Sequence, residues 1–150
     1  MAGLTIETVS LDEITRKGLT AKTGPHHPVV LVVDDEPVIA QTLTAILTSR
    51  GFAAMAAYDA ESALELARTV PPQLLLSDVG LPGMNGIDLA IAMQEAVPDC
   101  KVLLFSGHAA TAGLLAAAHD GGNEFTLLDK PIHPDDLLTR ISQLHMRLQP

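Results

Sequence analysis

The sequence predicts an α/β fold built around a parallel β-sheet. Two features support this prediction. Short apolar runs recur along the chain, and stretches in which apolar residues repeat at helical spacing lie between them. Strands buried on both faces read as continuous apolar runs. Strands that alternate with helices of 10–15 residues imply right-handed crossovers, which place all the strands parallel in one sheet.

The first half of the predicted domain contains three strand–helix units. The expected strands are Val29–Val33, Phe52–Tyr58 and Leu74–Ser77, and the expected helices are Pro37 to Gly51, Glu61–Thr69 and Gly86–Val97. Pro37 suits a first helical turn and Gly51 ends that helix. Asp59 is a plausible cap for the second helix. Apolar residues recur along the first helix at Val38, Ile39, Leu43, Ile46 and Leu47.

Two further units complete the predicted domain, which spans residues 29–148. The expected strands are Val102–Phe105 and Phe125–Leu128, and the expected helices are Thr111–His119 and Pro134–Met146. Residues 1–28 are mostly polar and end in a loop composition, Thr23 to Pro28. They predict a loosely attached extension that serves contacts, and a flexible tail explains them equally well. We expect no output domain in addition to this one.

Composition excludes several classes of protein. The 150 residues are 47% hydrophobic but only 3% aromatic, so one aliphatic core is expected. A net charge of −9 argues against binding to nucleic acid or an anionic membrane. No apolar stretch reaches the ~18 residues of a membrane span, and the N-terminus has no signal-peptide pattern. With one cysteine, Cys100, and no metal-ligand spacing among six histidines, we expect a cytoplasmic protein with neither a disulfide nor a zinc site.

Charged residues follow three of the predicted strands. Asp34 and Asp35 come after the first strand, Asp78 after the third, and Lys130 after the fifth. Ligand sites in open α/β sheets form at the carboxyl ends of strands. Crowded carboxylates repel one another unless a cation lies among them, and Mg²⁺ binds carboxylates together with phosphate oxygens. The pattern therefore suits a divalent cation and a phosphoryl group.

Each of these residues also has an ordinary structural interpretation. An aspartate after a strand is commonly a turn former, and acids before a helix favour its dipole. A lysine before a proline is usually a surface residue. The combination of Asp34, Asp35, Asp78 and Lys130 at successive strand ends favours the shared site.

Further motifs lie at the same strand ends. The turn Leu81-Pro82-Gly83-Met84-Asn85-Gly86 follows Asp78, Ser106 follows the fourth strand, and Pro131 follows Lys130. Asp35, Asp78, Ser106 and Lys130 succeed one another at intervals of 43, 28 and 24 residues. In these features residues 29–146 resemble the receiver domain of two-component response regulators. The resemblance implies a flavodoxin-like (βα)5 doubly wound sheet with strand order 2-1-3-4-5.

The resemblance also implies roles for individual residues. Asp78 is expected to be the phosphoacceptor, since a carboxylate can act as the nucleophile in aspartyl-phosphate formation. Lys130 is expected to contact the phosphoryl oxygens, and Ser106 matches the family's switch hydroxyl. The expected Mg²⁺ ligands are Asp35, Asp78 and the backbone carbonyl of Gly80, with Asp34 acting largely through water.

The chain departs from the family pattern in places. Leu127 stands where many members carry an aromatic switch residue, and residues 120–124 predict a reshaped loop before the fifth strand. Gly80 and His108 occupy positions that tune phosphoryl lifetime in the family. These departures predict a modified output face.

The function expected from the resemblance is a stand-alone receiver in a phosphorelay. A histidine kinase or histidine phosphotransfer protein would donate to Asp78, and the domain would signal to an unidentified protein rather than act as an enzyme. A receiver that signals without phosphorylation is the main alternative, favoured by Leu127. An enzyme or flavin carrier on the same fold ranks last, because neither GxxxxGK[ST] nor GxGxxG occurs. The oligomeric state stays open.

Overall fold

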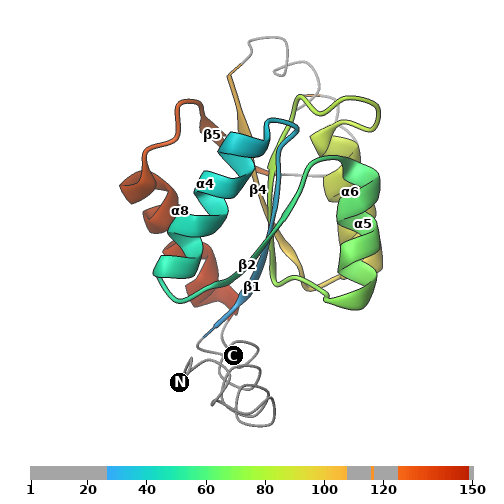
Figure 1. The fold of residues 1–150 in the computed structure, drawn as a ribbon. Coiled ribbons are helices and arrows are strands. Elements are labelled where there is room, and N and C mark those ends of the chain that lie inside the picture. The colour runs from blue at the N-terminus through green and yellow to red at the C-terminus, as the bar shows by residue number, and fades with distance from the viewer. Residues whose placement is uncertain (1–26, 108–115, 117–124, 149–150) are drawn as a thin grey trace, which may run out of the picture.

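The fold is a single five-stranded parallel sheet with helices on both faces (Figure 1). The computed structural model describes residues 27–107, 116 and 125–148. The strand order is β2-β1-β3-β4-β5, which confirms the predicted fold class and strand order. The strands are β1 (Val29–Val33), β2 (Ala53–Ala57), β3 (Leu74–Asp78), β4 (Lys101–Ser106) and β5 (Thr126–Asp129).

Four described helices cover the sheet, two on each face (Figure 1). The first pair is α4 (Pro37–Ser49) and α8 (Pro134–Leu148), and the second is α5 (Ala60–Thr69) and α6 (Gly86–Ala96). None of these helices is both long and apolar enough to cross a membrane. The predicted helix Thr111–His119 and most of the predicted extension lie outside the described residues. The predicted domain limits, 29 and 148, stay a prediction.

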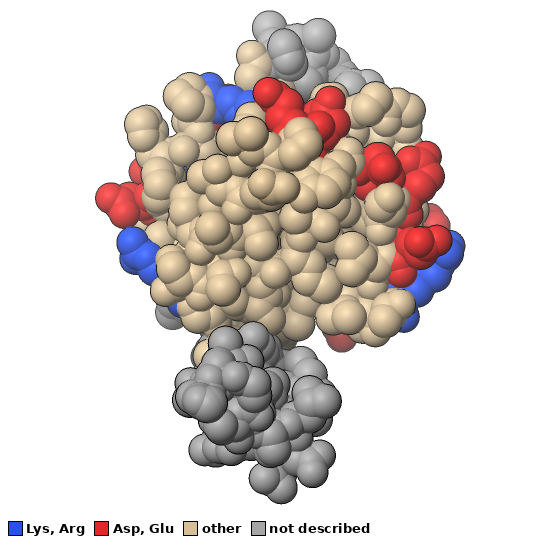
Figure 2. All heavy atoms as spheres, in the orientation of Figure 1, with Lys and Arg blue, Asp and Glu red and all other residues tan. Residues whose placement is uncertain are grey.

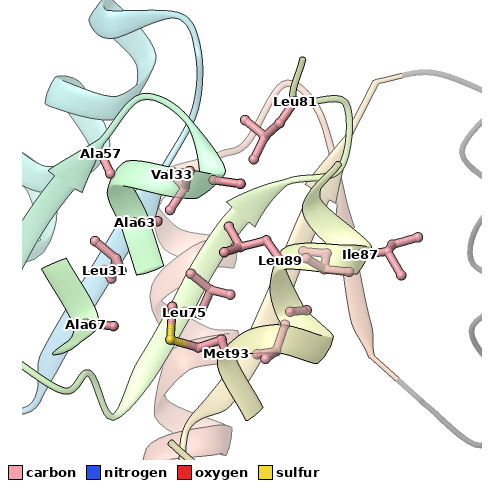
Figure 3. Packing of buried hydrophobic residues seen from close by; sticks show 14 of the residues in the cluster. Leu31, Val33, Ala57, Ala63, Ala67, Leu75, Leu81, Ile87, Leu89 and Met93 are labelled. Atoms are coloured by element: carbon pink, nitrogen blue, oxygen red, sulfur yellow. The ribbon is translucent and has the colours of Figure 1, made fainter. Parts of the chain in front are cut away.

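Two aliphatic cores lie on the two sides of the sheet. The core beneath α4 and α8 contains strand residues such as Val30, Leu76 and Phe105. Figure 3 shows the core beneath α5 and α6, where strand side chains meet small residues of α5 and larger residues of α6: Leu31, Val33 and Leu75, then Ala63 and Ala67, then Leu89 and Met93. Each fully buried large aliphatic side chain contributes roughly 1.5–3 kcal/mol. Cys100, 1% exposed, belongs to this second core.

The helices begin where local sequence signals place them. Pro37 lies in the first turn of α4, as predicted. The Asp59 side chain accepts a hydrogen bond of 2.7 Å from the Ser62 N–H, which confirms it as the cap of α5 and lowers its pKa. Asn85 caps α6 by accepting from the N–H groups of Ile87 and Asp88, both at 2.9 Å. These caps fix the turns that precede the helices.

Several predicted element bounds differ from the structure by one or two residues. Strand β2 is shorter than expected, since it excludes Phe52 and Tyr58. Val38, which falls in the predicted apolar repeat of α4, is 75% exposed. The buried residues of that helix are instead Ala40, Leu43 and Leu47. A sequence repeat identifies an apolar stripe, but the sheet covers only part of its width.

Gly86 allows α6 to start directly against the end of β3. Its N–H donates to the Val79 carbonyl at 2.9 Å. A Cβ atom at this position would lie 2.0 Å from the Asp78 carbonyl oxygen and 2.8 Å from the Val79 Cα. Both of these atoms belong to backbone, so neither can move without displacing the strand end. Gly86 therefore fixes the position of the backbone that carries Asp78.

We predict that Gly86→Ala lowers the free energy of unfolding by about 2 kcal/mol or more, because overpacking against backbone forces a shift of the strand end. Gly80→Ala is the matched control, since a Cβ there would meet only the Asp78 Oδ1, at 3.9 Å. That control should change stability by less than about 0.5 kcal/mol. Urea denaturation followed by far-UV circular dichroism measures both. Equal stability of the two variants would contradict the packing role of Gly86.

Candidate functional site

The parallel register brings the predicted site residues to one edge of the sheet. Val33 of β1 pairs with Ser77 of β3, so Asp34 and Asp78 follow at neighbouring positions. Ser106 of β4 pairs with Asp129 of β5, and Lys130 follows. The Lys130 N–H donates to the Ser106 carbonyl at 3.0 Å. The chain segments that carry the four charged residues therefore meet because their strands end together.

Three carboxylates form a compact cluster at this edge. One oxygen each from Asp34, Asp35 and Asp78 lies within 4.8 Å of the other two. Asp34 is fully buried, Asp78 is 7% exposed, and Asp35 is exposed to solvent. The cluster is therefore buried on one side and open on the other, which gives a ligand a route of entry.

The Lys130 ammonium joins two of these carboxylates. Its Nζ lies 3.3 Å from the Asp34 Oδ2 and 3.1 Å from the Asp78 Oδ2. It also lies 5.2 Å from the centroid of the Phe105 ring, within the range of a cation–π contact. The sequence predicted that Lys130 shares a site with the aspartates, but not its contacts with Asp34 and Phe105. No sequence signal marks them, because both depend on how deep the side chains lie.

Backbone N–H groups orient the other oxygen of each paired carboxylate. The Glu36 N–H donates to the Asp34 Oδ1 at 2.9 Å, and the Gly80 N–H donates to the Asp78 Oδ1 at 3.1 Å. The side chain of Glu36, the N-cap residue of α4, makes no capping hydrogen bond. Asp34 and Asp35 therefore belong to the cluster at the strand ends, and the Glu36 side chain does not cap the helix.

Burial and ion pairing have opposite effects on the pKa of each buried charged group in the site. Burial raises the pKa of Asp34, and the Glu36 N–H and the Lys130 charge offset only part of this effect. Burial also works to lower the pKa of Lys130, but the hydrogen bond and charge of Asp78, together with Asp34, outweigh it and the pKa is raised. Lys130 is therefore a cation at neutral pH, and three carboxylates around one ammonium leave the cluster net negative.

The donor set fits a magnesium ion. Mg²⁺ prefers oxygen ligands and is commonly held by one or two carboxylates, waters and phosphate oxygens. The cluster offers carboxylate oxygens close together, a solvent-open side, and no sulfur or imidazole ligand among the described residues. Such a cluster is typical of the magnesium site of a receiver domain.

The remaining predicted residues lie around this cluster. Ser106 is buried at the end of β4, and Gly80 is exposed beside Asp78. Leu127 is half-buried in β5 and packs, with Phe125, against the core beneath α5 and α6. His108 and the loop 120–124 lie outside the described residues. The individual roles of Ser106, Gly80 and Leu127 stay predictions.

Comparison with known proteins assigns the family. A family model, the response regulator receiver domain, matches residues 30–142. The chain belongs to this family. The resemblance inferred from the strand-end motifs is thereby confirmed. A receiver domain is a signalling module of two-component systems rather than an enzyme in its own right, and histidine kinases are its partners.

Individual curated proteins are similar to most of this chain. The DNA-binding response regulator MtrA of Mycolicibacterium smegmatis is 32% identical over 112 residues, covering 75% of this chain and 48% of that protein. The probable transcriptional regulatory protein TcrX of Mycobacterium tuberculosis is 33% identical over 118 residues, covering 79% and 50%. The chain thus spans about half the length of these curated relatives.

Solved receiver structures also superpose on the chain. The signal receiver domain of an HD domain-containing protein from Pseudomonas fluorescens Pf-5 gives a TM-score of 0.75 at 29% identity, covering 81% of this chain and 97% of that one. A CheY-like receiver domain protein from Methanospirillum hungatei JF-1 gives 0.74 at 25% identity, covering 82% and 97%. The similarity thus extends over nearly the whole of these solved domains.

We predict that Asp34→Asn stabilises the protein at neutral pH in the absence of divalent cations. A group whose pKa is raised on folding contributes stability that is full below its unfolded-state pKa and is lost as the pH rises through its folded-state pKa. The ionised Asp34 is therefore costly at pH 7, whereas asparagine keeps the oxygen that accepts from Glu36. The expected result is a gain in the free energy of unfolding, which should shrink as the pH is lowered from 7 toward the ordinary pKa range of an aspartate.

Urea denaturation in EDTA buffers across this pH range measures the gain. Asp35→Asn is the matched control, because Asp35 is exposed and should change stability by less than about 0.5 kcal/mol. A loss of stability in Asp34→Asn at pH 7, or a gain that grows toward acid pH, would contradict the assigned effect of burial.

Proposed function

We propose that Asp78 accepts a phosphoryl group from a histidine kinase or a histidine phosphotransfer protein. The observation that carries the proposal is the placement of the Lys130 ammonium between Asp34 and Asp78, within a cluster that also contains Asp35. A nucleophile, a cation for phosphoryl oxygens and a set of metal ligands then lie in one opening. Membership of the receiver family supports this assignment.

The transfer requires little chemistry from the protein beyond positioning. A carboxylate oxygen of Asp78 forms a bond to phosphorus while the bond from phosphorus to the donor's imidazole nitrogen breaks, and the imidazole leaves with that electron pair. Phosphoryl transfer depends chiefly on alignment and on neutralising charge. The Gly80 N–H orients the Asp78 carboxylate, and Lys130 is placed to attract the phosphoryl oxygens.

A bound Mg²⁺ would neutralise the charge on the phosphoryl oxygens and on the carboxylates. The residues that would hold it are Asp35, Asp78 and the Gly80 carbonyl, with Asp34 acting through water. The cluster of carboxylate oxygens within 4.8 Å of one another supports this ligand set. Lys130 then exchanges its Asp78 contact for the phosphoryl group, since the ammonium cannot pair fully with both.

Signalling follows from the connection between Lys130 and Ser106. The Lys130 N–H bonds to the Ser106 carbonyl, so the two strand ends are linked. In this proposal the Ser106 hydroxyl turns toward the phosphoryl group and the surface beyond β4 changes for an unidentified partner protein in the cytoplasm. Leu127 replaces the usual aromatic in that movement. The proposed domain covers residues 29–148, preceded by the extension 1–28.

We predict that incubation with acetyl phosphate and Mg²⁺ adds one phosphoryl group to the wild type and none to Asp78→Ala. Acetyl phosphate transfers its phosphoryl group directly to an activated carboxylate. Asp88→Ala is the control, because Asp88 is an exposed aspartate in the first turn of α6. Intact mass spectrometry with and without EDTA measures the gain. Labelling of Asp78→Ala equal to that of the wild type would make the acceptor assignment wrong.

We also predict that Asp35→Asn weakens Mg²⁺ binding by at least about tenfold, because a magnesium site with few carboxylates loses a direct ligand. Asp88→Asn should bind Mg²⁺ like the wild type. Amide chemical shifts near Asp78, titrated with MgCl₂, report the affinity. Unchanged affinity in Asp35→Asn would contradict the ligand assignment. Absence of both Mg²⁺ binding and labelling in the wild type would favour the phosphorylation-independent receiver instead.

A further inference from the structure

An aromatic ring lies beside the proposed phosphoacceptor. The parallel register pairs Phe105 of β4 with Asp78 of β3. Asp34, which follows β1, occupies the neighbouring position on the other side of Asp78. Phe105 is fully buried and packs in the core beneath α4 and α8. Residues at matched positions of neighbouring parallel strands point to the same face of a sheet, so Asp34, Asp78 and Phe105 form one row across three strand ends.

The Lys130 ammonium contacts every member of this row. Its Nζ lies 3.3 Å from the Asp34 Oδ2, 3.1 Å from the Asp78 Oδ2 and 5.2 Å from the centroid of the Phe105 ring, over the ring face. A separation of less than about 6 Å is the range of a cation–π contact. Two carboxylates and one ring thus define the position of a single nitrogen atom, and the ring is the only one of the three that carries no net charge.

The Lys130 side chain needs such support because part of it is open to solvent. It is 22% exposed, and Figure 2 shows charged atoms at the upper end of the molecule, where the strands of Figure 1 end. A lysine ammonium is strongly hydrated and its stem is flexible, so water competes with the carboxylates for it. Gly107 steadies only the stem, since a Cβ there would lie 3.4 Å from the Lys130 Cβ and 3.8 Å from its Cδ. The ammonium itself depends on its two carboxylates and the ring.

Packing alone does not require an aromatic residue at position 105. The chain is only 3% aromatic, and the two residues that precede Phe105 in β4 are leucines. A leucine at this position would fill the same core, but it would not attract a cation. The face of an aromatic ring carries partial negative charge, which attracts an ammonium most strongly where water is partly excluded. Solvent also cannot displace a buried ring, so the attraction persists when Lys130 leaves Asp78.

We propose that Phe105 is a positioning residue, whose ring holds the Lys130 ammonium between Asp34 and Asp78. The ring is fully buried, so it does not contact an incoming ligand and acts only through Lys130. Its contribution to phosphoryl transfer rests on the proposed acceptor role of Asp78, whereas its hold on the ammonium does not. Since a preorganised charge lowers the reorganisation needed during transfer, removal of the attraction should slow phosphorylation of Asp78 without abolishing it.

Fluorination of the ring separates this attraction from packing. Mono-, di- and trifluorinated phenylalanine at position 105 progressively remove negative charge from the ring face with little change in size. Labelling of the full-length chain by acetyl phosphate and Mg²⁺ should slow stepwise, by about two- to fivefold in total. The same series at position 125 is the control, because Phe125 packs against the core on the opposite face of the sheet. An unchanged rate at position 105, or an equal decline at position 125, would overturn the proposal.

Nuclear magnetic resonance of the unphosphorylated protein tests the contact itself. A ring face shifts nearby protons upfield, so the Lys130 Hε signals should lie upfield in the wild type and return to ordinary values in Phe105→Leu. Leu103→Val is the matched control, because it removes a similar volume from the same strand and core and should preserve the shift. If the wild type accepts no phosphoryl group, the proposed function fails, but an upfield shift lost only in Phe105→Leu still supports the hold on Lys130. Ordinary Hε shifts in the wild type, or a shift that survives Phe105→Leu, would overturn it.

Discussion

The Lys130 ammonium between two carboxylates is the interaction on which the site depends. Strands β1 and β3 both end in aspartates, and their parallel register places the negative charges side by side. Such crowding is unfavourable in a buried setting unless a cation offsets it. Lys130, at the end of the far strand β5, supplies that charge across the intervening end of β4. One side chain thus compensates carboxylates at two strand ends.

Backbone groups give this cluster its rigidity. Each paired carboxylate has one oxygen on a main-chain N–H and the other on Lys130, so little rotational freedom is left. The helix that follows Asp78 packs so closely at Gly86 that the strand end cannot shift. A preorganised set of charges reduces the reorganisation needed when an anionic ligand arrives. The cost is borne by Asp34, whose burial raises its pKa and makes its charge unfavourable for folding.

Much of the fold and the position of the site could be predicted from sequence, because both depend on local patterns. Apolar runs such as Val29–Val33 and turn residues such as Pro37 mark where strands and helices start, and parallel topology then brings Asp34, Asp78 and Lys130 together. How deeply each site side chain is buried could not be predicted. Nothing in the sequence distinguishes the buried Asp34 from the exposed Asp35, since one residue along the chain reverses the direction of a side chain. The exposure of Val38 could not be predicted either, because an apolar repeat does not show which of its members the sheet covers.

Lys130 connects the acidic cluster to the surface of α4. The same residue pairs with Asp78 and lines an apolar groove between α4 and the segment that follows β5, so a change in its position alters both places. An anion that draws the ammonium away from Asp78 therefore also changes the charge at the rim of the groove. Lys130 is the one ionic group among the described residues that line the groove, since α4 contributes no charged side chain there, so any change in charge at the groove comes from this residue.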